Sequence, residues 1–302
     1  MDNLEKNNSQ KLDYSIGVVT YVARFEDFFM PIIRQLTSAF PDKEIVCIIN
    51  GHPDQTLQAG YLKKVTAFLT QFPNVRYLSY EKHQPLARCF NWLLMMSFAP
   101  RMLILNDDLN ITLLFRGELE RALATNPDFF IINRSWSHFV ISKDIVKKVG
   151  WFEERLPGTG QEDGDYRARM ENLGFEVIQA NCHGVINYVA PQKNAGWQNI
   201  SSVSKMGGKS SEANDEFFNK KFIESGKSKE GHPAYKINSG METPQFYDFN
   251  SLNNDEKFIP PTAFKQDRPN PLLKSLLPFQ WTYSFTRKLG GRAYRFLKSK
   301  LS

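Results

Sequence analysis

The chain has 302 residues, 41% hydrophobic and 23% charged, a composition that is ordinary for a folded globular protein and excludes disorder throughout. Its formal net charge of +6 is unevenly spread: residues 269–302 hold seven basic residues and no acidic one, which leaves the rest at −1. A nucleic-acid partner is therefore not expected, since a protein that tracks a phosphate backbone carries its cations on the folded domain.

The cysteines and the apolar segments indicate a reducing compartment and no membrane span. Cys47, Cys89 and Cys182 are far apart, odd in number and without a CxxC pair, which argues against a disulfide framework or a zinc site. The first residues are too polar for a signal peptide. The longest uncharged apolar stretch, Cys89 to Pro100, is shorter than the roughly 20 residues that span a bilayer. We therefore expect a cytoplasmic protein.

Up to about residue 190, short apolar runs alternate with longer segments of helical period. The runs that predict strands are Ile16 to Val22, Glu44 to Asn50, Val75 to Tyr80 and Arg101 to Asn106. The segments between them that predict helices are Phe25 to Phe40, Thr56 to Phe72 and Pro85 to Phe98. Strict alternation predicts right-handed crossovers and an α/β fold with a doubly wound, mostly parallel sheet. Ligands of such sheets bind beyond the carboxyl ends of the strands.

The second half of the chain is predicted less regularly. Strands are expected at 128–133, 137–142 and 175–181, and helices at 143–149 and 162–173. From Ala190 to Asn270, Gly, Ser, Asn, Lys and Pro dominate, so this part is expected to be rich in loops, with one short amphipathic piece around Asn214 to Ile223.

Two adjacent carboxylates, Asp107 and Asp108, directly follow a buried strand. Such a pair is costly to hold together unless a cation or a hydrogen-bond network compensates it, and Mg²⁺ binds through one or two carboxylates plus substrate phosphates. The pattern fits a metal–diphosphate site. It fits equally well an Asx turn or a cap of the next segment.

A second acidic group follows a glycine-rich lead-in, where Glu162, Asp163 and Asp165 open a helix. A carboxylate kept ionised there and facing a cleft would suit a general base. The simpler interpretation is ordinary acidic bias in a first helical turn, with Arg169 paired to Asp165. His183 is a third candidate, as a metal ligand, although a lone histidine is more often structural.

Four segments in this order make the chain resemble a GT-A glycosyltransferase, in particular the inverting family 2 typified by bacterial polysaccharide-synthesis enzymes. They are VVTYVAR, LARCFNWLL, ILNDDLNI in the place of the DXD motif, and VKKVGWFEERLPGTGQEDGDYRARMENLGFEV. The similarity runs from about Ile16 to Tyr188, with a weaker echo to about Phe222. It implies a catalytic domain over 15–225, between a flexible N-terminus at 1–14 and a loop-rich linker at 226–268.

The resemblance also implies roles for individual residues. Asp108 matches the carboxylate that contacts a divalent metal, Mn²⁺ or Mg²⁺, with Asp107 in support and His183 where many members supply a further metal contact. Asp163 matches the catalytic base, and Glu162 a residue that orients the acceptor or its neighbour. The positions that match nucleotide-sugar contacts are Thr20, Tyr21, Arg24, Arg88, Asn91 and, at the end of the second strand, Asn50.

The implied reaction is an inverting transfer from a nucleotide-sugar to a hydroxyl of a glycan or lipid-linked saccharide. Asn50 is a departure, because the family usually has Asp there to hold uracil, so a UDP-sugar is expected without being fixed. A catalytically inactive relative that only binds a membrane or a partner is an alternative. A sugar-phosphate nucleotidyltransferase is less favoured, because the turn from Thr20 to Arg24 has no glycine to cradle a phosphate.

Residues 269–302 interleave seven cations with leucine and aromatic side chains, as a helix in a membrane interface does. Each cation near an anionic leaflet contributes on the order of 1 kcal/mol. We therefore expect a peripheral location at the inner face of the cell membrane. The alternative is that these aromatic residues pack on the catalytic domain.

Overall fold

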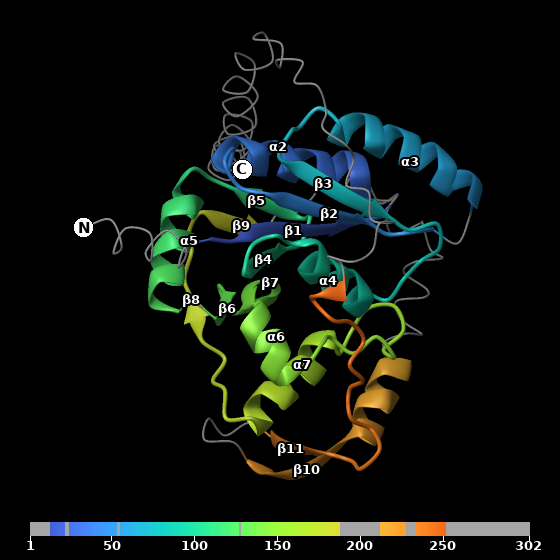
Figure 1. The fold of residues 1–302 in the computed structure, drawn as a ribbon, viewed down its shortest axis with the longest axis vertical. Coiled ribbons are helices and arrows are strands. Elements are labelled where there is room, and N and C mark those ends of the chain that lie inside the picture. The colour runs from blue at the N-terminus through green and yellow to red at the C-terminus, as the bar shows by residue number, and fades with distance from the viewer. Residues whose placement is uncertain are drawn as a thin grey trace, which may run out of the picture. The chain divides into compact units, whose positions relative to one another are not determined.

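The computed structural model describes residues 13–21, 24–52, 55–126, 128–187, 212–227 and 233–251. Their centre is a seven-stranded sheet with the order β3-β2-β1-β4-β7-β6-β8 (Figure 1). Its strands are β1 (Ser15–Thr20), β2 (Ile45–Ile49), β3 (Val75–Ser79), β4 (Arg101–Leu105), β6 (Phe129–Ile132), β7 (Ser135–Ser142) and β8 (Gln179–Ala180).

The sheet is mostly parallel. β1 pairs in parallel with β2 and β4, and β2 with β3, whereas β7 runs antiparallel to both β4 and β6. All of β2 and nearly all of β1 and β4 are buried, as their unbroken apolar sequences require of strands covered on both faces. The predicted α/β class, with a doubly wound and mostly parallel sheet, is confirmed.

Helices cover both faces of this sheet (Figure 1). On each face, apolar side chains of the helices and strands pack into a separate cluster. One face carries η2 (Phe25–Phe29), α2 (Met30–Ala39), α3 (Gln55–Leu69) and α5 (Leu114–Thr125). The other face carries α4 (Leu86–Met96), α6 (Lys143–Val149) and α7 (Glu162–Asn172). The loops at the strand ends are therefore anchored on a rigid three-layer scaffold.

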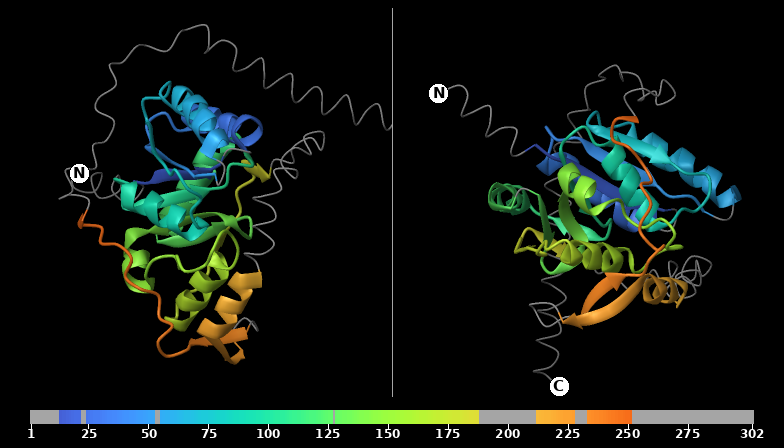
Figure 2. Two further views of the ribbon diagram at one scale, coloured as in Figure 1. Left: turned by 90° about the vertical axis from the view of Figure 1, so that its right-hand side faces the viewer. Right: turned by 60° about the horizontal axis from the view of Figure 1, so that its bottom comes forward.

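Two small antiparallel ribbons and one further helix lie outside the sheet. β5 (Leu109–Ile111) pairs with β9 (Val185–Asn187), and β10 (Phe222–Lys227) pairs with β11 (Pro233–Ile237). A helix over 212–221 leads into β10 and lies beside α7, which also contacts β11 (Figure 2). After β11 the chain returns to the core, where the Phe249 ring lies 4.6 Å from that of Trp151.

Several elements differ from those expected. The strand predicted at 175–181 is reduced to Gln179–Ala180, and α5, β5 and β9 had no clear signal. The expected boundary at 225 falls inside β10, and the segment expected as a linker contains β11 and aromatic residues packed on the core. Tyr14, expected in the flexible N-terminus, is buried against Phe40.

The predicted tail at 269–302 and most of the predicted N-terminus at 1–14 lie outside the described residues. Among the helices of the described part, none combines the length and the apolar character that crossing a bilayer requires.

Candidate active site

Thr20 and Asp107 lie next to each other at the point of the sheet where the strand order reverses, between β1 and β4. From β1 the chain moves outward to β2 and β3, and it then places β4 on the other side of β1. Because β1 and β4 are parallel they end at the same edge, where the Thr20 hydroxyl donates a 3.0 Å hydrogen bond to Asp107 Oδ2. Such a switch point is where doubly wound sheets bind ligands.

One guanidinium holds both carboxylates of the acidic pair. Arg24 Nε and Nη2 each lie 2.6 Å from Asp107 Oδ1, and Nη2 lies 3.0 Å from Asp108 Oδ2. The guanidinium also lies 4.5 Å from the centroid of the Phe28 ring. Asp107 is buried, whereas the Asp108 side chain is 37% exposed. The pair therefore has one closed carboxylate and one open to a ligand.

Burial and charge act against each other at this pair. Burial raises the pKa of Asp107, although Arg24 and Thr20 both stabilise the charged form. Burial also lowers the pKa of Arg24, but Asp107 and Asp108 outweigh it and hold that pKa above its ordinary value. Burial raises the pKa of the neighbouring Tyr21. The two carboxylates are thus paired with Arg24, a side chain that stays positively charged.

Asn50 shapes the loop beside this edge. Its Oδ1 accepts hydrogen bonds of 2.9 Å from the backbone N–H groups of Gly51 and Gln84, and its Nδ2 donates to the Gln84 carbonyl at 2.9 Å. A Cβ on Gly51 would lie 2.2 Å from the Lys82 carbonyl carbon, so only glycine allows this approach. Asn50 therefore connects the ends of β2 and β3.

Arg88 and Asn91 have partners within the protein. Arg88 Nε donates to Glu154 Oε2 at 2.6 Å. Asn91 is fully buried, donates to the Phe152 carbonyl and to Glu154 Oε1, and accepts from the Phe152 N–H. Asn91 therefore joins α4 to the chain just before residues 157–163, which we call the acidic loop, while the 41% exposed Arg88 still faces solvent.

The acidic loop lies against the start of α4, since the Leu86 N–H donates to the Gly158 carbonyl at 2.8 Å. Glu162 is buried and accepts a 2.6 Å hydrogen bond from the Gly160 N–H. Desolvation by burial raises the pKa of Glu162 to about 7. Asp163 beside it is exposed, and its Oδ1 accepts from the Gly164 N–H at 2.9 Å. One carboxyl is thus enclosed and the other is accessible.

Asp165, the third acidic residue, is structural. Arg169 lies 2.7 Å from its Oδ2 and also donates to the carbonyls of Val149 and Trp151. Lys221 Nζ donates to its other oxygen. The interpretation of Asp165 as the partner of Arg169 at helical spacing is confirmed.

His183 and Asp108 lie beyond opposite ends of the β5–β9 ribbon, contrary to the expectation that they share a metal site. In this ribbon Leu109 faces Asn187 and Ile111 faces Val185. The His183 side chain is 86% exposed, and its Nδ1 lies 3.3 Å from Glu118 Oε1. The register of the ribbon therefore separates the two residues.

His138 is a member of this region that the sequence did not indicate. It faces Leu105 across β7 and β4 and is buried, and its Nδ1 has no hydrogen-bond partner within the described ranges. Burial lowers its pKa, and the charge of Asp108 acts in the opposite direction. A single histidine inside an apolar strand carries no recognisable signal.

The described residues fit a divalent cation as the companion of a bound diphosphate. Both Asp107 oxygens are engaged by Thr20 and Arg24, which leaves Asp108 as the accessible carboxylate. In the part of the chain that the structure describes, no group of three or more His, Cys, Asp or Glu side chains could hold a metal ion. One carboxylate together with substrate phosphates is nevertheless a common way to bind Mg²⁺.

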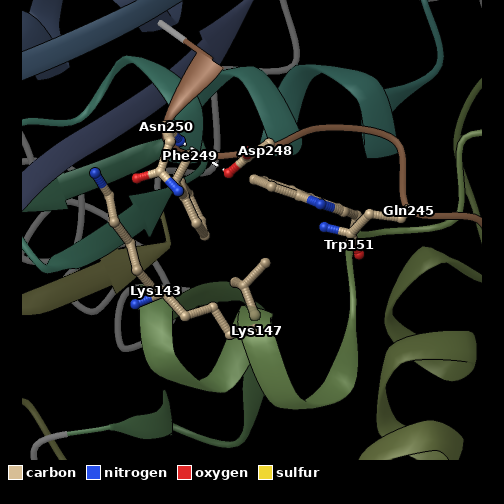
Figure 3. A pocket seen from close by; sticks show the side chains of 8 residues that line it. Lys143, Lys147, Trp151, Gln245, Asp248, Phe249 and Asn250 are labelled. Atoms are coloured by element: carbon tan, nitrogen blue, oxygen red, sulfur yellow. Dashed lines mark hydrogen bonds between the residues drawn. The ribbon is translucent and has the colours of Figure 1, made fainter. Parts of the chain in front are cut away.

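A separate pocket of about 310 Å³ lies between α6 and the segment at 245–250 (Figure 3). Its lining includes Lys143, Lys147, Trp151 and Phe249, and it contains none of the predicted site residues. It is therefore distinct from the site at the strand ends.

No protein-family model matches the chain, and no curated protein sequence does either. Among solved structures, S. aureus TarS 1–349 in complex with UDP is similar with a TM-score of 0.43 and 14% identity, over 69% of this chain and 71% of that one. Against another S. aureus TarS structure, the chain spans 39% of the relative's length, with a TM-score of 0.42 and 14% identity over 64% of this chain.

Glucosyl-3-phosphoglycerate synthase from Mycobacterium tuberculosis, in complex with Mn²⁺, UDP and glucosyl-3-phosphoglycerate, is similar with a TM-score of 0.46 and 13% identity. The match covers 80% of this chain and 94% of that one.

Proposed function

We propose that the protein is a glycosyltransferase that moves a sugar from a nucleotide-sugar, with UDP as the expected nucleotide, to a hydroxyl of a glycan or lipid-linked saccharide. The observation that carries the proposal is the meeting of Thr20, Arg24 and the Asp107–Asp108 pair at the switch point of the sheet. The ordered resemblance of four sequence segments to GT-A glycosyltransferases supports it.

The donor diphosphate is proposed to bind at Arg24 and Asp108. Arg24 provides a positive charge that does not titrate, and Asp108 would hold Mn²⁺ or Mg²⁺ together with the diphosphate. When bound, such an ion neutralises charge on the leaving diphosphate. Tyr21 is proposed to contact the nucleoside and Arg88 the donor. Asn50, expected as a nucleotide contact, is buried with both amide atoms hydrogen-bonded, and it is proposed to shape the loop that borders the nucleoside.

Asp163 is proposed as the general base. It is exposed at the start of α7, so an acceptor can reach it. The acceptor oxygen attacks the anomeric carbon while Asp163 takes its proton. The bond from that carbon to the diphosphate breaks on the opposite face, so the configuration inverts. Glu162 is proposed to orient the acceptor or the neighbouring Asp163 from its buried position.

Residues 269–302, which lie outside the described residues, are proposed to hold the protein at the cytoplasmic face of the membrane through their cations and aromatic side chains. Deletion of this segment should abolish cosedimentation with vesicles that contain anionic lipid. Equal cosedimentation of the full and shortened chains would contradict this part of the proposal.

The experiment that tests the activity measures release of nucleoside diphosphate from a panel of nucleotide-sugars, with and without Mn²⁺ or Mg²⁺. The proposal predicts metal-dependent release from one or a few donors that rises when a hydroxyl acceptor is added. Binding of nucleotide-sugar without release under any condition would instead favour the inactive binding protein. Release of pyrophosphate from a nucleoside triphosphate and a sugar phosphate would favour the nucleotidyltransferase.

A further inference from the structure

The acidic loop, which leads to Glu162 and Asp163, has a backbone conformation that depends on contacts from elsewhere in the chain. Gly158, Gly160 and Gln161 have φ angles of 66°, 110° and 65°, all in the left-handed region. Glycine adopts this conformation freely, whereas Gln161 adopts it at an energetic cost, and such conformations persist where surrounding contacts enforce them. The contacts that enforce this one come from the helix over 212–221, which is more than 50 residues away in the sequence.

Asn214 is the first of these contacts. Its Nδ2 lies 3.0 Å from the Pro157 carbonyl oxygen, 3.1 Å from that of Thr159 and 2.7 Å from that of Gly160. The Asn214 side chain is fully buried, and its Oδ1 has no hydrogen-bond partner in the described structure. The three carbonyls therefore determine the orientation of the amide. On the same helix, Asp215 accepts a 2.7 Å hydrogen bond from Gln161 Nε2.

Lys221, at the other end of this helix, holds α7. Its side chain is fully buried, and its Nζ donates to Glu153 Oε2 at 2.8 Å, to Thr243 Oγ1 at 2.6 Å and to Asp165 Oδ1. Asp165 lies two residues after Asp163 on α7. A buried lysine is stable only when its charge is paired in this way. The helix over 212–221 therefore contacts both the beginning of the acidic loop, through Asn214, and the first turn of α7, through Lys221.

A continuous set of contacts links Asn214 to the carboxyl groups of the site. Asn214 Nδ2 donates to the Gly160 carbonyl, and the N–H of the same Gly160 donates to Glu162 Oε2 at 2.6 Å. A change at Asn214 therefore moves the donor on which Glu162 depends, and with it the neighbouring Asp163. Figure 2 shows the helix over 212–221 beside α7, on the side away from the central sheet.

We propose that Asn214 and Lys221 are positioning residues, which set the acidic loop and the first turn of α7 so that Asp163 can reach the acceptor hydroxyl. This inference rests on the proposed glycosyl transfer. It gives the segment after residue 190 a part in catalysis, where the sequence indicated mainly loops. Misplacement of a catalytic group by about 1 Å can lower a rate by about 100-fold, so the helix is expected to control turnover without contact to substrate.

The test compares the full-length wild type with Asn214→Ala and Lys220→Met. Lys220 is the matched control, because it lies on the same helix but pairs with Glu216 at the surface. Amide hydrogen exchange over 157–165 is measured by mass spectrometry, together with the affinity for UDP and donor turnover as a function of pH. Exchange reports the loop directly and does not depend on any activity.

For Asn214→Ala we expect at least tenfold faster exchange over 157–165, kcat lower by about 100-fold and UDP affinity within about twofold of the wild type. The acid limb of the pH–rate profile should also shift, because the surroundings of Glu162 change. Lys220→Met should match the wild type in every measurement. A merely destabilised protein would lose UDP affinity and kcat together, with no shift in the pH profile.

Unchanged exchange in Asn214→Ala would overturn the inference, as would faster exchange with unchanged kcat and pH profile. Lack of nucleotide-sugar turnover in the wild type would instead overturn the proposed function. The exchange data would in that case still show whether Asn214 holds the loop, so the two failures are distinguishable.

Discussion

Two acidic clusters in the described part of the chain each contain a pair of carboxylates, but they differ in how completely these charges are enclosed by other side chains. At the strand ends, Asp107 and Asp108 share one cation of the described chain, Arg24, with a hydrogen bond from Thr20 to Asp107, and the Asp108 side chain is partly exposed. At the first turn of α7, Glu153 and Asp165 are enclosed by three cations, Lys221, Arg155 and Arg169. Each carboxylate oxygen of Glu153 and Asp165 accepts a hydrogen bond from one of these cations.

The difference separates carboxylates that can act on a ligand from those that hold the fold. Buried charges are tolerated when they are paired and hydrogen-bonded, and a cluster paired on all sides has no oxygen left for a ligand. The open cluster keeps one available carboxylate at the place where ligands of such sheets bind. Exposure, more than the number of acidic residues, therefore identifies the site.

The largest expected effect is on the enclosed cluster. Lys221→Met should lower the free energy of unfolding by about 3 to 5 kcal/mol, because it leaves Glu153 and Asp165 short of a cation in a buried place. Lys220→Met, at the exposed neighbouring position, should change it by no more than about 0.5 kcal/mol. Urea unfolding of both variants measures the contrast, and equal effects would show that the enclosure does not matter.

The next effect concerns the accessible carboxylate of α7. Asp163→Asn should lower kcat by about 10²- to 10⁴-fold, the usual contribution of a general base, and leave UDP affinity unchanged. Glu171→Gln, on the same helix but paired with Arg167, should keep wild-type turnover. Near-native turnover of Asp163→Asn with a confirmed donor and acceptor would exclude Asp163 as the base.

Glu162 should make stability depend on pH. Its pKa rises on folding from 4.5 to about 7, so the folded state retains a proton that the unfolded chain has lost. Stability therefore falls as the pH rises from about 4.5 to 7, by up to about 3 kcal/mol from this group. Glu162→Gln should exceed the wild type in stability at pH 8 and equal it near pH 4, as thermal unfolding can measure. A constant difference at both pH values would contradict this.

The smallest effect is expected at the open cluster. Asp108→Asn should change the free energy of unfolding by no more than about 0.5 kcal/mol, because Asp108 is 37% exposed and Arg24 retains Asp107. Asp107→Asn should cost more, since this buried residue accepts from both Thr20 and Arg24. Urea unfolding that ranks the two variants the other way would reverse the assignment of closed and open carboxylates.

The first four strands and the helices between them could be predicted because their signals are local. Unbroken apolar runs such as that of β2 occur where both faces of a strand are covered, and the structure buries all of β2. The acidic pair could likewise be recognised, because it lies one residue after the end of the buried β4. An apolar run and the polar residues next to it can both be recognised from a single sequence.

The supports of the acidic loop could not be predicted, because their partners are distant in the chain. Asn214 and Lys221 are polar residues in a polar stretch, and nothing local shows that they are buried against residues more than 50 positions away. The position of His183 depended on the register of the short β5–β9 ribbon, which had no sequence signal. Tertiary pairing, rather than residue type, decides these cases.

Binding of a nucleoside diphosphate together with a divalent cation at Asp107 and Asp108 can be measured by calorimetric titration with UDP in the presence and absence of Mn²⁺. We expect Mn²⁺ to strengthen UDP binding at least tenfold in the wild type and in Asp144→Asn, whose carboxylate is exposed on α6. The same addition should have little effect in Asp108→Asn. No binding of UDP to the wild type, or equal strengthening by Mn²⁺ in Asp108→Asn, would contradict it.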